Sequence, residues 1–259
     1  MRVDVCGLPI DPVTAEEALE AVSRAVRARR EAAPARPLAL FSANVDMLVK
    51  ASRDPAFARD LAAADLLLPD GVPVLWMARG LGRRLPERVA GSDLVPRLAG
   101  RAAAEGFSLF LLGGAPGVAD EAAARLRALH PTLAVAGTLA PPRGFDDDPD
   151  ELARAVAAVA AARADVVLVG LGAPRQERFV LGQGPRLGCA ALLAVGGTFD
   201  LVAGRLRRAP LPLQRAGLEW AWRMAQEPLR LGRRYLVEDA AVLPLYARAL
   251  WRRWAGGVE

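Results

Sequence analysis

Asp70 stands where a short apolar run ends, in the stretch "LLLPDGVPV" over residues 66–74. A carboxylate at the end of a buried strand can accept a proton from a substrate hydroxyl, which makes Asp70 a candidate general base. An Asp-Gly pair is also a common way to form a tight turn, and the residues alone leave both roles open. Ser42 and Asn44 belong to another such end and could bond the same ligand or cap the helix that follows.

A glycine-rich loop follows a third apolar run, in "FLLGGAPGVADEA" over residues 110–122. The pattern predicts strand, loop and helix, and Gly113 and Gly114 would let the backbone approach a phosphate at the helix N-terminus. It is not the GxGxxG of dinucleotide-binding proteins, and the acidic residue expected about 20 positions later is missing. The loop therefore suits a nucleotide diphosphate better than NAD, while a plain turn before a helix is the alternative.

Two further strand ends carry polar residues, "GLGAPRQE" (170–177) and "GGTFD" (196–200). We expect Gln176 to point into a ligand cleft. Glu177 could add to substrate binding or simply favour the positive end of the helix dipole. Asp200 could accept hydrogen bonds from a ribose or a uracil, or cap a helix.

Metal and nucleophile chemistry find little support in the sequence. Cys6 and Cys189 fit no metal-ligand spacing, and His130 is the single histidine, so a Cys/His metal cluster cannot be built. His130 precedes a proline and is interpreted as the end of a helix. The acidic run "DDDPD" (146–150) is interpreted as a solvated loop. We expect neither a metal ion nor a cofactor.

The elements that must position these residues alternate in a regular way. Short, nearly all-apolar runs are typical of strands buried on both faces, and Ala-rich amphipathic segments lie between them. Asp54-Pro55 and Asp148-Pro149 each resemble a helix cap followed by proline in the first turn. The expected strands are 38–43, 65–69, 107–113, 133–137, 165–170 and 190–196, and the expected helices are 14–31, 54–63, 71–80, 92–105, 116–130 and 149–163. This alternation predicts an α/β fold with a mostly parallel, Rossmann-like sheet flanked by helices.

The C-terminal part of the chain differs from the rest. Residues 205–259 hold eleven Arg against five acidic residues, a net charge of +6, while the whole chain carries +5. Four of the five Trp and both Tyr also lie there. We therefore expect an α/β body over 1–204, with two lobes divided near 141–150, and a C-terminal helical, basic and aromatic appendage over 205–259.

The appendage has four interpretations: an ordinary core helix, a nucleic-acid patch, a membrane-contacting segment and a lid over an active site. No nucleic-acid module accompanies it, so we expect no nucleic-acid partner. Residues 242–257 pair Trp and Leu with Arg, as in segments that contact an anionic membrane surface. In 217–236, Arg223, Arg230 and Arg234 share a helical face that a diphosphate would neutralise, which favours a lid bent at Pro228.

Eight blocks of the chain together resemble one known family. In order they are "SANVDML", "LLLPDGVPV", "ERVAGSDL", "LFLLGGAPG", "VGLGAPRQE", "AVGGTFDLVAG", "RRAP" and "GLEWAWRMAQEPLRLGRRYL". The series closely resembles the WecG/TagA/CpsF family of bacterial glycosyltransferases, from about residue 3 to residue 236. The resemblance implies an inverting, metal-independent transfer of N-acetylmannosamine, or a related hexose or uronic acid, from a UDP-sugar to a polyprenyl-diphosphate-linked saccharide in cell-surface polysaccharide synthesis.

The resemblance also implies roles for individual residues. Asp70 falls on the family's proposed general base, and Ser42 falls where members usually have Thr. Matches to substrate-site positions are Asn44, Arg88 and Gln176. Matches to appendage arginines thought to close over the nucleotide diphosphate are Arg223, Arg230 and Arg233.

The expected partners are a UDP-sugar donor, a lipid-linked saccharide acceptor and an anionic membrane surface, with a homo-oligomer left open. The N-terminus lacks the apolar run of a signal peptide, and no segment reaches the ~20 apolar residues of a membrane span. We expect a cytoplasmic enzyme, peripheral on the inner face of the cell membrane. A nucleotide-sugar-modifying enzyme without a lipid acceptor, or a non-enzymatic UDP-binding module, are the alternatives.

Overall fold

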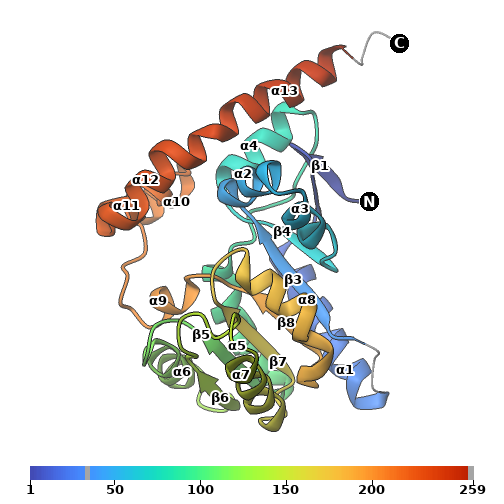
Figure 1. Ribbon diagram of the computed structural model, residues 1–259, viewed down its shortest axis with the longest axis vertical. Coiled ribbons are helices and arrows are strands. Elements are labelled where there is room, and N and C mark those ends of the chain that lie inside the picture. The colour runs from blue at the N-terminus through green and yellow to red at the C-terminus, as the bar shows by residue number, and fades with distance from the viewer. Residues whose placement is uncertain (33–35, 256–259) are drawn as a thin grey trace. The chain divides into compact units, whose positions relative to one another are not determined.

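The computed structural model describes residues 1–32 and 36–255, without the side chains of Arg215 and Arg230 (Figure 1). By contacts within the chain these residues form two compact units. Unit 1 comprises residues 1–14, 42–90 and 206–259, and unit 2 comprises residues 15–41 and 91–205. The predicted appendage thus groups with two earlier segments in unit 1. The loop 141–150, where we expected a division between lobes, lies inside unit 2.

The central sheet has six strands, in the order β4-β3-β8-β7-β5-β6. The pairings of β3 with β8, β7 with β8, β5 with β7 and β5 with β6 are all parallel. The strands are β3 (Leu38–Ala43), β4 (Leu66–Pro69), β5 (Leu109–Gly113), β6 (Val135–Leu139), β7 (Val166–Gly170) and β8 (Ala191–Ala194). Leu111, Leu168 and Leu193 are almost completely buried, as expected for strands covered on both faces. The predicted parallel α/β fold is confirmed.

Helices precede or follow each of these strands. They are α1 (Ala15–Glu31), α2 (Val45–Arg53), α3 (Pro55–Ala62), α4 (Val72–Gly80), α5 (Gly91–Glu105), α6 (Val118–Leu129), α7 (Pro149–Ala161), α8 (Arg175–Leu187) and α9 (Thr198–Val202). Asp54 caps α3 by accepting bonds from the amides of residues 56 and 57, and Asp148 caps α7 in the same way. His130 ends α6. These predicted helix ends are confirmed.

Unit 1 also holds a small antiparallel hairpin, which the sequence did not predict. Its strands are β1 (Val3–Val5) and β2 (Leu8–Ile10), and the turn places Cys6 and Gly7 at φ +53° and +93°. The Asp11 carboxylate accepts a hydrogen bond of 2.7 Å from the Leu67 amide. This bond holds the end of the hairpin beside β4, the strand that leads to Asp70.

From Leu211 onward the described C-terminal part of unit 1 consists of short helices joined by turns. It runs through α10 (Leu211–Arg215), α11 (Glu219–Gln226), α12 (Pro228–Arg233), the π-helix η1 (Arg234–Glu238), the 3-10 turn η2 (Asp239–Ala241) and α13 (Val242–Ala255). The helix does break at Pro228, as predicted. Among the described residues, no helix has both the length and the apolarity needed to cross a bilayer.

Candidate functional site

In unit 1 the carboxyl ends of β3 and β4 lie next to each other. The Asp70 amide donates a hydrogen bond of 2.9 Å to the Ala43 carbonyl, so Asp70 stands beside the residues that follow β3. Gly71 has φ +107°, a conformation that side-chain-bearing residues rarely adopt, and α4 begins at Val72. The half-buried Asp70 therefore leaves the sheet at a fixed turn just before a helix N-terminus, where the dipole favours a carboxylate.

Asn44 has the capping role that the sequence left open. Its side-chain oxygen accepts a hydrogen bond of 3.2 Å from the Met47 amide and begins α2. Ser42 is half-buried and lies two residues earlier, inside β3. Because residues two apart on an extended chain face the same side, Ser42 and Asn44 point in the same direction from this strand end.

Arg88 is held close to the same strand end. The neighbouring Val89 amide donates a hydrogen bond of 2.7 Å to the Pro69 carbonyl at the end of β4. The Arg88 guanidinium donates a bond of 2.9 Å to the carboxylate of Glu219, and each side chain is 19% exposed. Glu219 is the first residue of α11, so this half-buried ion pair connects the predicted substrate region with the C-terminal helices.

The arginines of the C-terminal helices differ strongly in their surroundings. Arg223 on α11 has a buried Nε that bonds to no atom of the described residues. Arg230 lies on α12, but its side chain is outside the described part of the structure. Arg233 has a side chain that is 84% exposed and lies 3.4 Å from the carboxylate of Glu238. Of the two arginines whose side chains are described, Arg223 is therefore the more enclosed.

A cluster of carboxylates surrounds Arg234, the arginine that we expected to share a face with Arg223. Its guanidinium lies 3.2 Å from the Asp46 carboxylate and 3.8 Å from that of Asp239. Asp46 also accepts a bond of 2.8 Å from Lys50. Burial, together with the negative charge of Asp46, raises the pKa of Asp239 to about 6. In this structure Arg234 is thus neutralised by protein carboxylates that link η1 and η2 to α2. Asp46 belongs to the block "SANVDML", but we expected no role for it from the sequence.

In unit 2 the glycine loop after β5 needs glycine for both conformation and space. Gly113 and Gly114 have φ +110° and +79°, and the Gly114 amide donates a bond of 3.0 Å to the Gly170 carbonyl. A Cβ on Gly113 would overlap the backbone of Gly170. The loop therefore packs backbone to backbone against the end of β7 and leads through Gly117 into α6.

Gln176 is placed differently from our expectation. It is 3% exposed, and its amide oxygen accepts hydrogen bonds from the Gly172 amide at 3.2 Å and the Gly196 amide at 3.0 Å. Its amide nitrogen donates a bond of 2.7 Å to the carboxylate of Glu177, which is completely buried. Because these atoms already have partners, Gln176 joins the loops after β7 and β8 rather than offering its amide to a cleft. Asp200 is half-buried in the first turn of α9.

The remaining reactive groups of the described chain are held in inert surroundings. Burial raises the pKa of Cys6 to about 11 and that of Cys189 to about 12, so neither is a thiolate at neutral pH. In the acidic loop, Arg175 bonds Asp146 and keeps the pKa of that carboxyl below its ordinary value. Within the described residues, no three His, Cys, Asp or Glu side chains are grouped as metal ligands.

Comparisons with known proteins extend over both units. The profile of the Glycosyl transferase WecG/TagA/CpsF family matches residues 3–256. One similar protein is the N-acetylglucosaminyldiphosphoundecaprenol N-acetyl-beta-D-mannosaminyltransferase of Bacillus spizizenii. It is 32% identical over 191 residues, which are 74% of this chain and 72% of the relative.

Proposed function

The chain belongs to the WecG/TagA/CpsF family of glycosyl transferases, and from this we propose a specific reaction for it. It moves N-acetylmannosamine, or a related hexose or uronic acid, from a UDP-sugar to a polyprenyl-diphosphate-linked saccharide, with inversion and without a metal ion. The observation that carries the proposal is the likeness to a transferase whose acceptor is N-acetylglucosaminyl diphosphoundecaprenol. The position of Asp70 at the paired ends of β3 and β4 supports it.

Asp70 acts in this reaction as the general base. It takes the proton of the acceptor hydroxyl as that oxygen attacks the anomeric carbon of the donor sugar, and the bond from that carbon to the UDP oxygen breaks. The departing diphosphate gains negative charge, which a guanidinium such as that of Arg223 is suited to stabilise. Asn44 fixes the beginning of α2, and Ser42 binds substrate from the same strand end.

The test is a transfer assay with the purified full chain, a panel of UDP-sugars and GDP-mannose, and a lipid-linked N-acetylglucosamine acceptor. We expect Asp70→Asn to lower turnover by ~10²-fold or more while UDP binding stays within about twofold. Asp65→Asn, at the opposite end of the same strand, is the matched control and should keep its turnover. Near-normal turnover of Asp70→Asn would refute the assignment of the base.

The alternatives to this reaction give different results in the same assay. Release of UDP at the same rate with and without acceptor would indicate a nucleotide-sugar-modifying enzyme. Binding of UDP with no release from any donor would indicate a binding module. Release that requires the lipid-linked acceptor supports the transfer proposed here.

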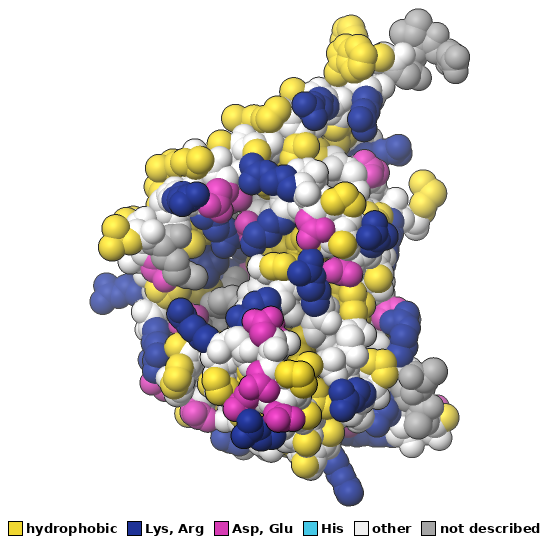
Figure 2. Space-filling view, viewed as in Figure 1, with side chains coloured by type: hydrophobic (Ala, Val, Ile, Leu, Met, Phe, Trp, Pro, Cys, Tyr) yellow, Lys and Arg dark blue, Asp and Glu magenta, His cyan; other side chains and the backbone are white. Residues whose placement is uncertain are grey.

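We further infer that the enzyme works at the inner surface of the cell membrane, through α13. Trp251 and Trp254 are 72% and 84% exposed, and Leu243 is exposed on the same helix. Figure 2 shows hydrophobic and basic side chains next to each other along this helix. Tryptophan suits the headgroup region of a bilayer, and arginine suits its anionic surface, so α13 has the composition of an interfacial helix.

Sedimentation with vesicles of phosphatidylcholine and phosphatidylglycerol tests this placement. Replacing both Trp251 and Trp254 with Ala should weaken vesicle binding by about tenfold or more, because two interfacial side chains are lost. Leu129→Ala, which removes an exposed apolar side chain of α6 in unit 2, is the control. Equal vesicle binding by both variants and the unchanged chain would exclude α13 as the contact.

A further inference from the structure

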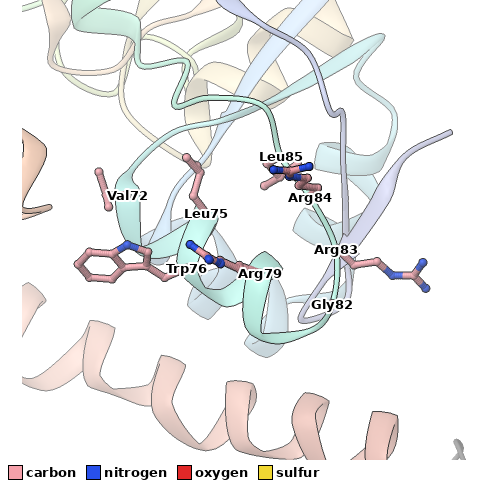
Figure 3. A pocket seen from close by; sticks show the side chains of 8 residues that line it. All are labelled: Val72, Leu75, Trp76, Arg79, Gly82, Arg83, Arg84 and Leu85. Carbon is pink, nitrogen blue, oxygen red and sulfur yellow. The ribbon is translucent and has the colours of Figure 1, made fainter.

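Unit 1 contains a pocket of about 600 Å³, and none of the predicted site residues whose side chains are described lines it. It is formed by α4 and the loop that follows, and Figure 3 shows the side chains around it. The volume lies in the range of sites that hold a small molecule. The lining residues are Val72, Leu75, Trp76, Arg79, Gly82, Arg83, Arg84 and Leu85.

The lining changes from apolar to basic along α4. Val72, Trp76 and Arg79 are spaced four and three residues apart, so they share one face of the helix. Val72 lies two residues after Asp70, and Arg79 lies about 10 Å further along the helix axis at 1.5 Å per residue. A molecule in this pocket can therefore place one end near Asp70 and the other end at Arg79. The distance between these two ends is about the length of one sugar and its phosphate.

The basic end holds an unusual concentration of positive charge. Residues 79–84 contain three arginines and no acidic residue. Their side chains form no ion pair with any residue that the structure describes. In Figure 3, the end of Arg79 lies between Trp76 and Leu75, Arg84 lies next to Leu85, and Arg83 extends to the other side of the loop. Guanidinium groups that line one pocket without a paired carboxylate are suited to an anion with several oxygens.

The C-terminal helices border this pocket at two places. A Cβ on Gly217 would lie 3.0 Å from Val72 and from Trp76, so the turn before α11 packs closely against the apolar end. At the basic end, Arg253 of α13 donates a bond of 2.7 Å to the Gly80 carbonyl, and its guanidinium lies against Gly82. A fourth guanidinium, from the helix that carries the exposed tryptophans, thus stands beside the basic loop.

We propose that this α4 pocket binds the diphosphate of the lipid-linked acceptor. Arg79 and Arg84 contact the diphosphate, and Val72, Leu75 and Trp76 lie along the sugar that joins the diphosphate to the reacting hydroxyl near Asp70. The identification of the ligand rests on the proposed function, since it is the acceptor of that reaction that carries both a diphosphate and a prenyl chain. The site also gives a role to the contact between Arg253 of α13 and the loop 79–84. It brings the point where the lipid leaves the pocket close to the helix that contacts the membrane.

Direct binding to the full-length chain tests the pocket without any transfer step. Farnesyl diphosphate, a soluble prenyl diphosphate, and UDP are titrated separately by calorimetry. The double variant Arg79→Gln/Arg84→Gln should bind farnesyl diphosphate about 10- to 100-fold more weakly, because two charge-assisted contacts are lost. Its UDP affinity should stay within about twofold. Arg59→Gln, at an exposed arginine of α3 that does not line the pocket, should bind both within about twofold of the unchanged chain.

Two results would overturn the pocket. One is unchanged farnesyl diphosphate binding by the double variant. The other is an equal loss of binding to farnesyl diphosphate and to phosphatidylglycerol vesicles, which would make the arginines a general contact for anionic lipids. The transfer assay distinguishes failure of the pocket from failure of the proposed function. Arginine-dependent binding without sugar transfer would refute the function and keep the pocket. Transfer by the double variant with an unchanged acceptor KM would refute the pocket and keep the function.

Discussion

The ion pair between Arg88 and Glu219 should hold α11 against the rest of unit 1. The two side chains join parts of the chain 131 residues apart, at 2.9 Å and with 19% exposure each. Two unit charges about 4 Å apart attract by about 4 kcal/mol at an effective dielectric of 20. Partial desolvation and the ordering of both side chains offset most of this, which leaves a net coupling of about 1–2 kcal/mol.

A double-mutant cycle isolates this coupling, because Glu219 also lies 3.7 Å from Arg208 and single changes would mix the two contacts. The variants are Arg88→Met, Glu219→Gln and both together. Native-state hydrogen exchange of the α11 amides is the measurement, since local opening of one helix need not follow global unfolding. A coupling of 1–2 kcal/mol corresponds to roughly 5- to 30-fold faster exchange in α11 when the pair is broken.

Glu16→Gln is the matched control for this experiment. Glu16 forms ion pairs with Arg97 and Arg101 in unit 2, but its side chain is 61% exposed. An exposed pair contributes little, so we expect no more than about 0.5 kcal/mol there and no change in α11 exchange. If the cycle at Arg88 and Glu219 gave a coupling no larger than this control, the pair would not be what docks α11.

Two other predictions concern stability. The fold raises the pKa of Asp239 from the ordinary 3.8 to about 6. Between these pH values the folded state binds more protons than the unfolded state, so the free energy of unfolding falls as the pH rises from about 4 to 6. The unfolding free energy of Asp239→Asn minus that of the unchanged chain should therefore rise by about 2 kcal/mol from pH 4 to pH 7, as measured by urea titration. A difference that does not depend on pH would contradict this. Gly113→Ala should lower Tm by several °C, because its Cβ meets the backbone of Gly170. Gly106→Ala, also at positive φ but with open space, is the control, and equal losses would mean that backbone strain alone is responsible.

The sheet could be predicted because its strands are short, apolar and buried on both faces. β3 begins and ends at the predicted residues, and β4, β5, β7 and β8 lie within their predicted ranges. β6 is shifted by two residues toward the C-terminus, because an edge strand with half-exposed side chains has a weaker apolar signal. The β1–β2 hairpin was missed because its turn places a cysteine, rather than Asn or Asp, at positive φ.

The candidate site was less predictable, because residue type does not reveal a side chain's partner. Gln176 at a strand end was expected to face a ligand, and only the fold shows that the amides of two loops meet its oxygen. The sequence left two roles open for Asn44, and the structure shows one of them, the cap of α2. The contacts of Arg88 and Arg234 join distant segments, which spacing along the chain cannot indicate. The assignments to donor and acceptor remain predictions.

The division of unit 1 into three chain segments affects how its parts can be studied. Residues 206–259 supply buried side chains of that unit, including Ala209 and Leu231. Deleting them would remove part of a hydrophobic core along with the surface of α13, so an inactive truncated chain would say little about lipid contact. Unit 1 cannot be expressed as one contiguous fragment either. Even a circular permutation that brought residues 206–259 directly before residues 1–14 would leave residues 15–41 of unit 2 between the first two segments, so the two units exchange chain at more than one place.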